Sequence, residues 1–168
     1  EDVRGFSAFP EWYEWTLVGR ATVLAPMHAG VETGRKARKR TIDFANAPHW
    51  NPRMSWEPRP VYVVEGRPKA ISSLSPHPYA KVVMYVDAES YLVPLKEMYD
   101  KKGRLWRVQV NAFNESPDMH SLPPRTALSL TVNVRDGHAT VVPTYETRTN
   151  VGLDRARFTE TWLRTQGK

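Results

Sequence analysis

Histidines and cysteines most often ligate metals or attack substrates, so their number and spacing decide whether that chemistry is available. The sequence contains no cysteine, which excludes disulfide scaffolds, thiolate zinc sites and cysteine nucleophiles. None of its five histidines has a second histidine one helical turn away, as a zinc-binding helix requires. All five fall in predicted loops, where we interpret them as exposed or packing residues: His28, His49, His77, His120 and His138. The sequence therefore predicts no metal site.

Carboxylates are the other groups that transfer protons. Asp87 and Glu89 lie two residues apart, and Asp100 precedes Lys101 and Lys102. The three acids sit in polar turns between apolar runs, where a carboxylate that bonds its own backbone is the simpler interpretation. The sequence has no nucleophile elbow, no glycine-rich phosphate loop and no dinucleotide fingerprint. We therefore predict a protein that is not an enzyme and that holds no cofactor.

The net charge of +6 is concentrated in one tract. Residues 35–40, RKARKR, carry five positive charges, so the rest of the chain is almost neutral. Such a tract can bind phosphate backbones or anionic lipid headgroups, but a solvated loop is the simpler interpretation. The sequence has no helix-turn-helix pattern and no RNA-binding signature. Nucleic acid is not an expected partner, and the role of the tract stays open.

Short apolar runs separated by turn residues are the main structural pattern. Trp12–Val18 continues into Ala21–Leu24 after Gly19, which predicts one strand with a bend or bulge. Asp100–Gly103 and Asp136–Gly137 favour tight hairpin turns. Further strands are predicted where β-branched and aromatic residues gather or alternate with polar ones: Val61–Arg67, Tyr79–Val86, Tyr91–Tyr99, the run from Trp106, Ala127–Val134 and Ala139–Glu146. Successive hairpins of this kind predict an antiparallel sheet.

Two regions depart from the hairpin pattern. Residues 26–60 lack periodicity and are interpreted as a long irregular loop with one short strand near Thr41–Phe44. Asp154–Leu163 predicts a short carboxy-terminal helix with Phe158 and Trp162 on its apolar side. The predicted fold is mainly β, a curved antiparallel sheet or half-barrel. Strongly twisted sheets curl in this way and leave one apolar face to be filled.

The best-alternating strands identify the side chains expected on that apolar face. These candidates for lining a ligand cavity are Trp106, Val108, Val110, Leu128, Leu130 and Val132. They either line such a cavity or form an ordinary close-packed core, and both interpretations stay open. Trp50 and Trp56 lie in the proline-rich part of the long loop. They are candidates for a gate or a partner contact, or for a lid that packs on the core.

Several segments resemble a known protein family in their order and spacing. They are Tyr13–Gly19 (YEWTLVG), Val61–Gly66 (VYVVEG), His77–Lys81 (HPYAK), Tyr85–Asp87 (YVD) and, most specific, Tyr99–Arg107 (YDKKGRLWR). From about Phe6 to Leu163 the chain resembles the carboxy-terminal part of domain-of-unknown-function family 1329, whose members are similar to outer-membrane lipoprotein-sorting proteins. Ala25–His28 (APMH) departs from the family's usual Val-Pro-Tyr-Asn-like segment.

This resemblance implies a LolA/LolB-like fold, in which a curved antiparallel sheet encloses a cavity for acyl chains. It also implies a periplasmic protein of the Gram-negative envelope, with or without attachment to the outer membrane, that works with exporters of the resistance-nodulation-division type. The function expected from it is a non-enzymatic carrier for a lipid-like hydrophobic ligand. The alternative is an envelope interaction or sensing module, similar to RseB, that holds no ligand.

The resemblance also bears on domain organisation. Residues 1–168 are expected to form a single domain or the carboxy-terminal half of a larger LolA/LolB-like domain, because family members are considerably longer. The chain begins at Glu1 without an initiator methionine, which predicts a removed leader or a piece of a longer protein. In the second case the missing amino-terminal half is a partner of the sheet, and an exposed sheet edge is expected to pair with a second copy.

Overall fold

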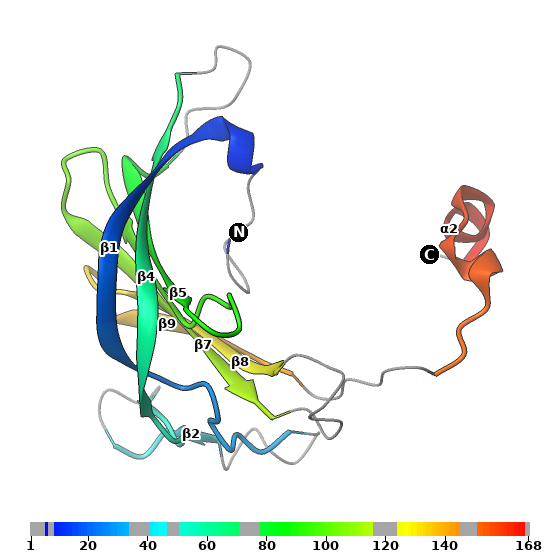
Figure 1. The fold of residues 1–168 in the computed structure, drawn as a ribbon. Coiled ribbons are helices and arrows are strands. Elements are labelled where there is room, and N and C mark those ends of the chain that lie inside the picture. Colours follow the sequence, from blue (N-terminus) through cyan, green and yellow to red (C-terminus); the bar gives the residue numbers. More distant parts are fainter. Residues whose placement is uncertain are drawn as a thin grey trace.

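One antiparallel sheet dominates the computed structural model, which describes residues 6, 9–33, 41–46, 51–70, 78–115, 124–144 and 151–166. Within these ranges the sheet has seven strands in the order β1-β4-β5-β6-β7-β8-β9. They are β1 (Tyr13–Ala25), β4 (Glu57–Pro68), β5 (Lys81–Asp87), β6 (Leu95–Tyr99), β7 (Leu105–Asn114), β8 (Arg125–Asn133) and β9 (His138–Pro143). The sheet is curved and is not closed into a barrel (Figure 1). The predicted mainly β fold with a curved antiparallel sheet is confirmed.

Hairpins connect most neighbouring strands. Every neighbouring pair except β1–β4 is consecutive along the chain. In the β6–β7 turn the backbone N–H of Gly103 donates to the Asp100 carbonyl at 2.9 Å, and Gly103 has a φ of +74°. Gly137, in the β8–β9 turn, has a φ of +62°. Glycine adopts such angles without steric cost, so both predicted hairpin turns are confirmed.

The connection from β1 to β4 is shorter than the predicted loop of residues 26–60. β4 begins at Glu57, so Pro58 and Pro60 lie inside a strand. Among the described residues β4 pairs here with β1 alone, because its pairing with β5 begins at Val61. A proline on the unpaired side of a strand deprives no neighbour of a hydrogen bond. The loop prediction is therefore wrong for residues 57–60, where the prolines do not interrupt the strand.

Two details of the amino-terminal half agree with expectation. The β1–β4 register shifts between Leu17 and Gly19, which confirms the predicted bend or bulge. The short strand predicted near Thr41–Phe44 is β2 (Ile42–Asp43), which pairs with β3 (Asn51–Pro52) in a separate small sheet. This small sheet lies at one end of the large one (Figure 1).

The strand predicted for Tyr91–Tyr99 is shorter than expected. β6 begins only at Leu95, after a turn in which Tyr91 has a φ of 58°, a conformation that no strand contains. The Asp87 carboxylate organises this turn by accepting hydrogen bonds from the backbone N–H groups of Glu89 and Ser90 at 3.2 and 2.8 Å. The backbone-bonding role predicted for Asp87 is thereby confirmed.

The segment that follows β1 bonds to β7, which is distant from β1 in the sheet order. The Phe113 N–H donates to the Pro26 carbonyl at 2.8 Å, and the Ala29 N–H donates to the Phe113 carbonyl at 2.9 Å. Beyond this point Ala29, Val31 and Ile42 form a buried cluster with Ala112 and Leu128 of the sheet. One end of the large sheet is therefore covered by the connection between β1 and β4.

The carboxy-terminal helix is present but divided. A 3-10 turn, η2 (Arg155–Phe158), precedes α2 (Glu160–Gln166). The Phe158 side chain, expected on the apolar side of the helix, is 73% exposed, and the Leu163 side chain is 61% exposed. The helix lies apart from the sheet (Figure 1). No helix among the described residues is long and apolar enough to cross a membrane.

The packing of Trp15 on Gly66 predicts the effect of adding a single methyl group. Trp15 lies opposite Gly66 in the β1–β4 register, and a Cβ at Gly66 would overlap the Trp15 ring. We expect Gly66→Ala to displace this ring, which also donates Nε1–H to the Pro10 carbonyl at 2.8 Å, and to lower the free energy of unfolding by about 1–3 kcal/mol. Urea denaturation measures the loss. Gly19→Ala is the matched control because no atom of the described residues lies within 4 Å of its Cβ position. Equal losses in the two variants would contradict the packing.

Substitutions in the exposed carboxy-terminal segment, by contrast, are expected to change the stability very little. We expect the double variant Phe158→Ser and Leu163→Ser to change the free energy of unfolding by less than about 0.5 kcal/mol, because neither side chain is buried. Met98→Ser in the buried core is expected to cost several times more, about 2–5 kcal/mol. Thermal unfolding followed by circular dichroism compares them. A large loss in the double variant would show that the segment packs on the rest of the chain.

Candidate ligand-binding face

The strand register places one continuous row of side chains on the same face of the sheet. Residues directly opposite each other in an antiparallel pair point to the same side. Following these pairs across all seven strands gives the apolar row, defined as Gly19, Val63, Tyr85, Leu95, Val110, Leu130 and Val141. Val110 and Leu130 are buried, whereas the other large side chains of the row are half-buried. The apolar row is therefore covered on β7 and β8 and partly open on the strands to either side.

Five of the six predicted cavity residues lie on this face. Val110 and Leu130 belong to the apolar row, and Val108 lies opposite Val132 in the next row towards the β6–β7 turn. Both of these valines are half-buried. Leu128 lies on the other side of the apolar row, buried against the segment that follows β1. The register thus brings the five residues together, and their contact with a ligand stays a prediction.

Trp106 leaves this face, contrary to the alternation expected from the sequence. Met98 pairs with Arg107 and Tyr99 pairs with Leu105, so Trp106 is the extra residue of a β-bulge. A bulge interrupts the alternation of side chains and redirects the inserted residue. The Trp106 ring accordingly packs against a separate buried cluster that consists of Tyr13, Tyr79, Val82 and Met98.

Of the two tryptophans predicted as gate or partner contacts, the structure describes only Trp56. Trp50 lies outside the described residues. Trp56 directly precedes β4 and is 43% exposed, so it does not act as a buried lid. Its predicted role as a gate or partner contact stays a prediction.

The opposite face carries polar side chains that are buried, although polar residues that alternate with apolar ones along a strand commonly face solvent. Gln109, Asn111 and Ser129 alternate with the apolar residues of β7 and β8, yet each is at most 2% exposed. Ser129 Oγ donates to Asn111 Oδ1 at 2.8 Å, and Asn111 Nδ2 donates to the carbonyl of Val93 in the β5–β6 connection at 2.9 Å. This connection covers the polar face at that point. Buried polar groups of this kind need partners, and here backbone and side-chain partners supply them.

A cluster of polar side chains borders the apolar row near the β6–β7 turn. Glu97, one step from Leu95 along this face, accepts hydrogen bonds from the hydroxyls of Tyr85 and Tyr99 at 3.1 and 2.6 Å. The hydrogen bond to Glu97 and burial raise the pKa of Tyr99 to about 12. Burial, followed by the charge of Glu97, raises the pKa of Tyr85 as well. Both phenols therefore stay protonated donors at neutral pH, and the apolar row has hydrogen-bonding groups at one border.

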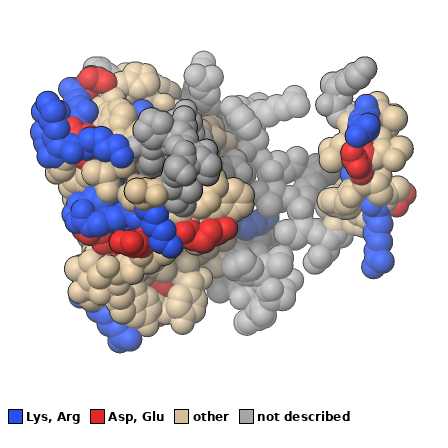
Figure 2. All heavy atoms as spheres, turned by 90° about the horizontal axis from the view of Figure 1, so that it is seen from above, with Lys and Arg blue, Asp and Glu red and all other residues tan. Residues whose placement is uncertain are grey.

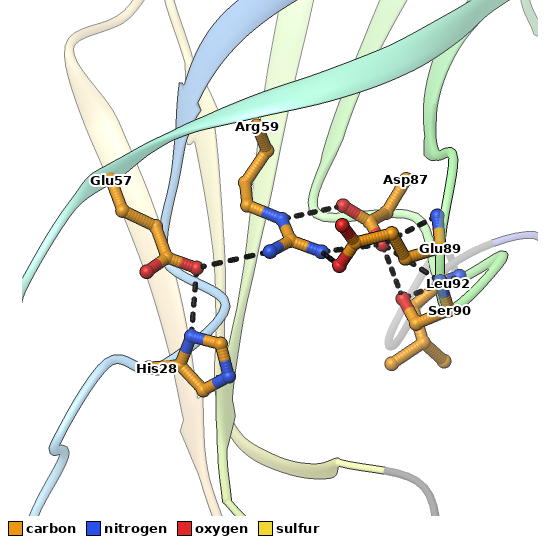
Figure 3. Close-up of polar contacts among 7 residues, drawn as sticks. All are labelled: His28, Glu57, Arg59, Asp87, Glu89, Ser90 and Leu92. Carbon is orange, nitrogen blue, oxygen red and sulfur yellow. Dashed lines mark hydrogen bonds and ion pairs between the residues drawn. The ribbon is translucent and has the colours of Figure 1, made fainter.

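A network of charged side chains fixes the opposite border, near the β5–β6 turn (Figure 3). Arg59 donates from Nε and Nη2 to the two carboxylate oxygens of Asp87 at 2.8 and 3.1 Å, and from Nη2 to Glu89 at 2.5 Å. Its Nη1 lies 3.7 Å from Glu57, which also contacts His28 Nδ1 at 2.8 Å. The network links β4, the β5–β6 turn and the segment after β1. Among the described residues no group of histidines and acids is arranged to hold a metal ion.

The electrostatics of Asp87 follow from these contacts. Burial alone would raise the pKa of Asp87, but the hydrogen bonds from Arg59 and Ser90 outweigh burial and lower the pKa to about 2 from its ordinary value of 3.8. A carboxyl whose pKa is depressed by folding stabilises the folded state wherever it is ionised in both states. Asp87 therefore holds the turn most firmly above about pH 4.

This depressed pKa predicts an acid-dependent loss of stability. As the pH falls from about 4 towards 2, Asp87 is protonated more readily in the unfolded chain, so we expect the free energy of unfolding to fall by about 2 kcal/mol through this group. Urea denaturation at a series of pH values measures it. Asp87→Asn should lose this component, whereas Glu89→Gln, whose side chain is 70% exposed in the parent, should keep it. Identical pH profiles for Asp87→Asn and the parent would contradict the expectation.

Comparison with known proteins gives the fold and family. The model of the family described as protein of unknown function DUF1329 matches residues 1–164. A domain from Vibrio parahaemolyticus, named after outer membrane lipoprotein sorting, is similar with a TM-score of 0.53 and 19% identity over 92% of this chain and 49% of that chain. A DUF1329 family protein from Desulfovibrio piger is similar with a TM-score of 0.53 and 17% identity over 90% of this chain and 47% of that chain. None of the curated proteins matches the sequence.

The comparisons also bear on domain organisation. The chain spans about half the length of these two solved structures. The expectation that it corresponds to the carboxy-terminal half stays a prediction. At these identities the structural likeness establishes a shared fold. Because the family model covers nearly the whole sequence, the chain belongs to the DUF1329 family, whose members are described as proteins of unknown function.

Proposed function

We propose that this protein binds a lipid-like hydrophobic ligand on the face of the sheet that contains the apolar row, and that it carries this ligand without chemical change. The observation that carries the proposal is the continuity of the row across seven strands, with half-buried side chains at Val63, Leu95 and Val141. Apolar surface that stays partly open gains free energy when it is covered, about 0.8 kcal/mol for each methylene group moved out of water. An acyl chain is a ligand of matching shape and chemistry.

The polar border of the face fits the headgroup of an amphiphilic ligand. Glu97 lies opposite Val108, so its carboxylate is next to the open valines. Lys81 is near it on the same face, where its Nζ pairs with Glu65 at 2.9 Å and lies 4.6 Å from the centre of the Tyr99 ring. A ligand whose tail lies along the apolar row therefore meets hydrogen-bonding groups at this border. Such separation of apolar and polar contacts is typical of lipid-binding sites.

The cellular setting of the proposal rests on resemblance. A neighbour of the same fold is named after outer membrane lipoprotein sorting, which supports a periplasmic location in the Gram-negative envelope. Partnership with an envelope transporter is part of the same proposal and rests on the family resemblance. The neighbours are about twice as long as this chain, so a further part of a longer protein is a candidate cover for the half-open face.

A second candidate function, an envelope interaction module without a ligand, is favoured by the edge strand β1. This strand has thirteen residues, and within the described part of the chain it pairs with β4 alone. Leu17, Val18 and Leu24 on it are each more than 60% exposed. Long exposed edges with apolar side chains are templates for pairing with another strand. A second copy of the chain or a different envelope protein would supply that strand.

A pair of double variants distinguishes the two functions. We expect Val108→Asn with Val132→Asn to lower the amount of lipid that co-purifies with the protein by about tenfold, because the open part of the apolar face becomes polar. Leu17→Asn with Leu24→Asn removes equally apolar side chains from the edge strand and should leave the lipid content unchanged. Mass spectrometry of organic extracts measures the lipid, and circular dichroism confirms folding.

Repeated absence of lipid from the parent protein would contradict the carrier function. So would equal lipid contents in the two double variants. A change in oligomeric state or partner binding that is confined to the Leu17 and Leu24 variant would instead support the interaction module.

A further inference from the structure

Cationic side chains gather at the end of the sheet where the β6–β7 and β8–β9 turns lie next to each other. The two turns are joined by an ion pair between Arg135 and Asp100, and by a hydrogen bond of 3.0 Å from the Val134 N–H to the Trp106 carbonyl. We define the turn patch as Lys101, Lys102, Arg104, Arg107 and Arg135. Figure 2, a view from above, shows groups of Lys and Arg side chains on one side of the sheet body, with Asp and Glu side chains beside them.

The positive charge of the turn patch is not balanced within the described part of the chain. Arg104 and Arg135 share the single carboxylate of Asp100. Arg107 donates to the neutral hydroxyl of Tyr79 at 2.9 Å, and Lys101 donates to the Tyr79 carbonyl at 3.1 Å. The Lys102 side chain is exposed and has no polar partner among the described residues. The only other acid in the two turns, Asp136, accepts a hydrogen bond from Asn133. The patch therefore carries an excess of positive charge.

Two guanidinium groups of the turn patch are held in place by an aromatic ring. The central carbon atoms of Arg107 and Arg135 lie 4.5 and 5.1 Å from the centre of the Trp106 ring. A guanidinium group that lies over a ring keeps N–H donors in its plane for phosphate or carboxylate oxygens. The Asp100 carboxylate also accepts hydrogen bonds from the backbone N–H groups of Lys102 and Arg104 at 2.9 and 2.8 Å, which fixes the turn that presents them. The turn backbone and two of the guanidinium groups are therefore held in place before any ligand binds.

The chemistry of this patch fits a surface of phosphate groups. We propose that the two turns dock the protein on a bilayer that contains anionic phospholipids, with Lys101 and Lys102 nearest the headgroups. Each cation near such a surface strengthens binding by about fivefold at moderate salt. The patch directly follows Tyr99 in the chain, so docking brings the polar border of the apolar face close to the membrane. The docking proposal rests on the proposed carrier function, but vesicle binding can be measured independently of ligand binding.

Vesicle binding tests the docking. We expect the full chain to sediment with vesicles of phosphatidylcholine and phosphatidylglycerol and not with vesicles of phosphatidylcholine alone, and to be released by salt. Lys101→Gln with Lys102→Gln should weaken the binding by about 25-fold, from the loss of two cations. The matched control, Arg20→Gln with Arg53→Gln, removes the same charge from exposed positions in β1 and near β3. It should bind within about twofold of the parent.

Three results would overturn the docking proposal. The first is equal binding by the Lys101 and Lys102 variant and the control. The second is equal binding to both kinds of vesicle. The third is loss of all binding when the basic residues of 35–40 alone are changed to glutamine. The lipid content of organic extracts is measured on the same variants, and the Lys101 and Lys102 variant should keep it. Vesicle binding without co-purified lipid would contradict the carrier function and leave the docking supported.

Discussion

The alignment of seven strands in one antiparallel register is the constraint on which the other features depend. It sets Val63, Leu95 and Val110 in a single row with matching residues of the remaining strands. A shift of one residue in any strand would move its apolar side chains to the other face. The two faces of the sheet carry different side chains: the face opposite the apolar row contains the buried amides of Gln109 and Asn111. A shift of register would therefore leave these amides without hydrogen-bond partners and would expose valines to water. Both effects lower the stability of a shifted sheet.

The borders of the sheet reinforce this register in different ways. At one end Arg59 links β4 to the β5–β6 turn through the buried carboxylate of Asp87. At the other end Asp100 organises the β6–β7 turn and pairs with Arg135 of the β8–β9 turn. Both acids resemble candidate catalytic groups in the sequence, yet their hydrogen bonds go to backbone and guanidinium groups that hold strands together. The two charged networks thus hold the ends of the sheet, and the apolar row lies between them.

Much of the fold could be predicted from the sequence because its signals are local. Gly103 and Gly137 mark turns that require a positive φ, and alternation in β7 and β8 identifies Val108, Val110 and Leu130 as neighbours on one face. The prediction was wrong where a residue's surroundings come from distant parts of the chain. Pro58 and Pro60 read as loop residues, because the sequence does not reveal that β4 has only one partner there.

The candidate site was predictable to a smaller extent. The bulge that turns Trp106 away depends on how β6 and β7 pair, which no local pattern encodes. Polar alternation alone favours solvent exposure for Gln109 and Asn111, because the β5–β6 connection that covers this face cannot be recognised from that pattern. Glu97, Tyr85 and Tyr99 were missed altogether, since residues of β5 and β6 meet only through the register. The predicted succession of the strands Tyr79–Val86 and Tyr91–Tyr99 is the one signal that could have placed the three residues near each other.

The most direct measurement of ligand binding uses the absence of native cysteines, which allows a single environment-sensitive label to be attached at one position. Val132→Cys places the label on the open part of the apolar face, and Leu17→Cys places it on the exposed edge strand. Binding of a fatty acid to the apolar face predicts a blue shift in the emission of the label at position 132, saturating with ligand, and no shift at position 17. Equal shifts at the two positions, or no shift at position 132, would contradict it.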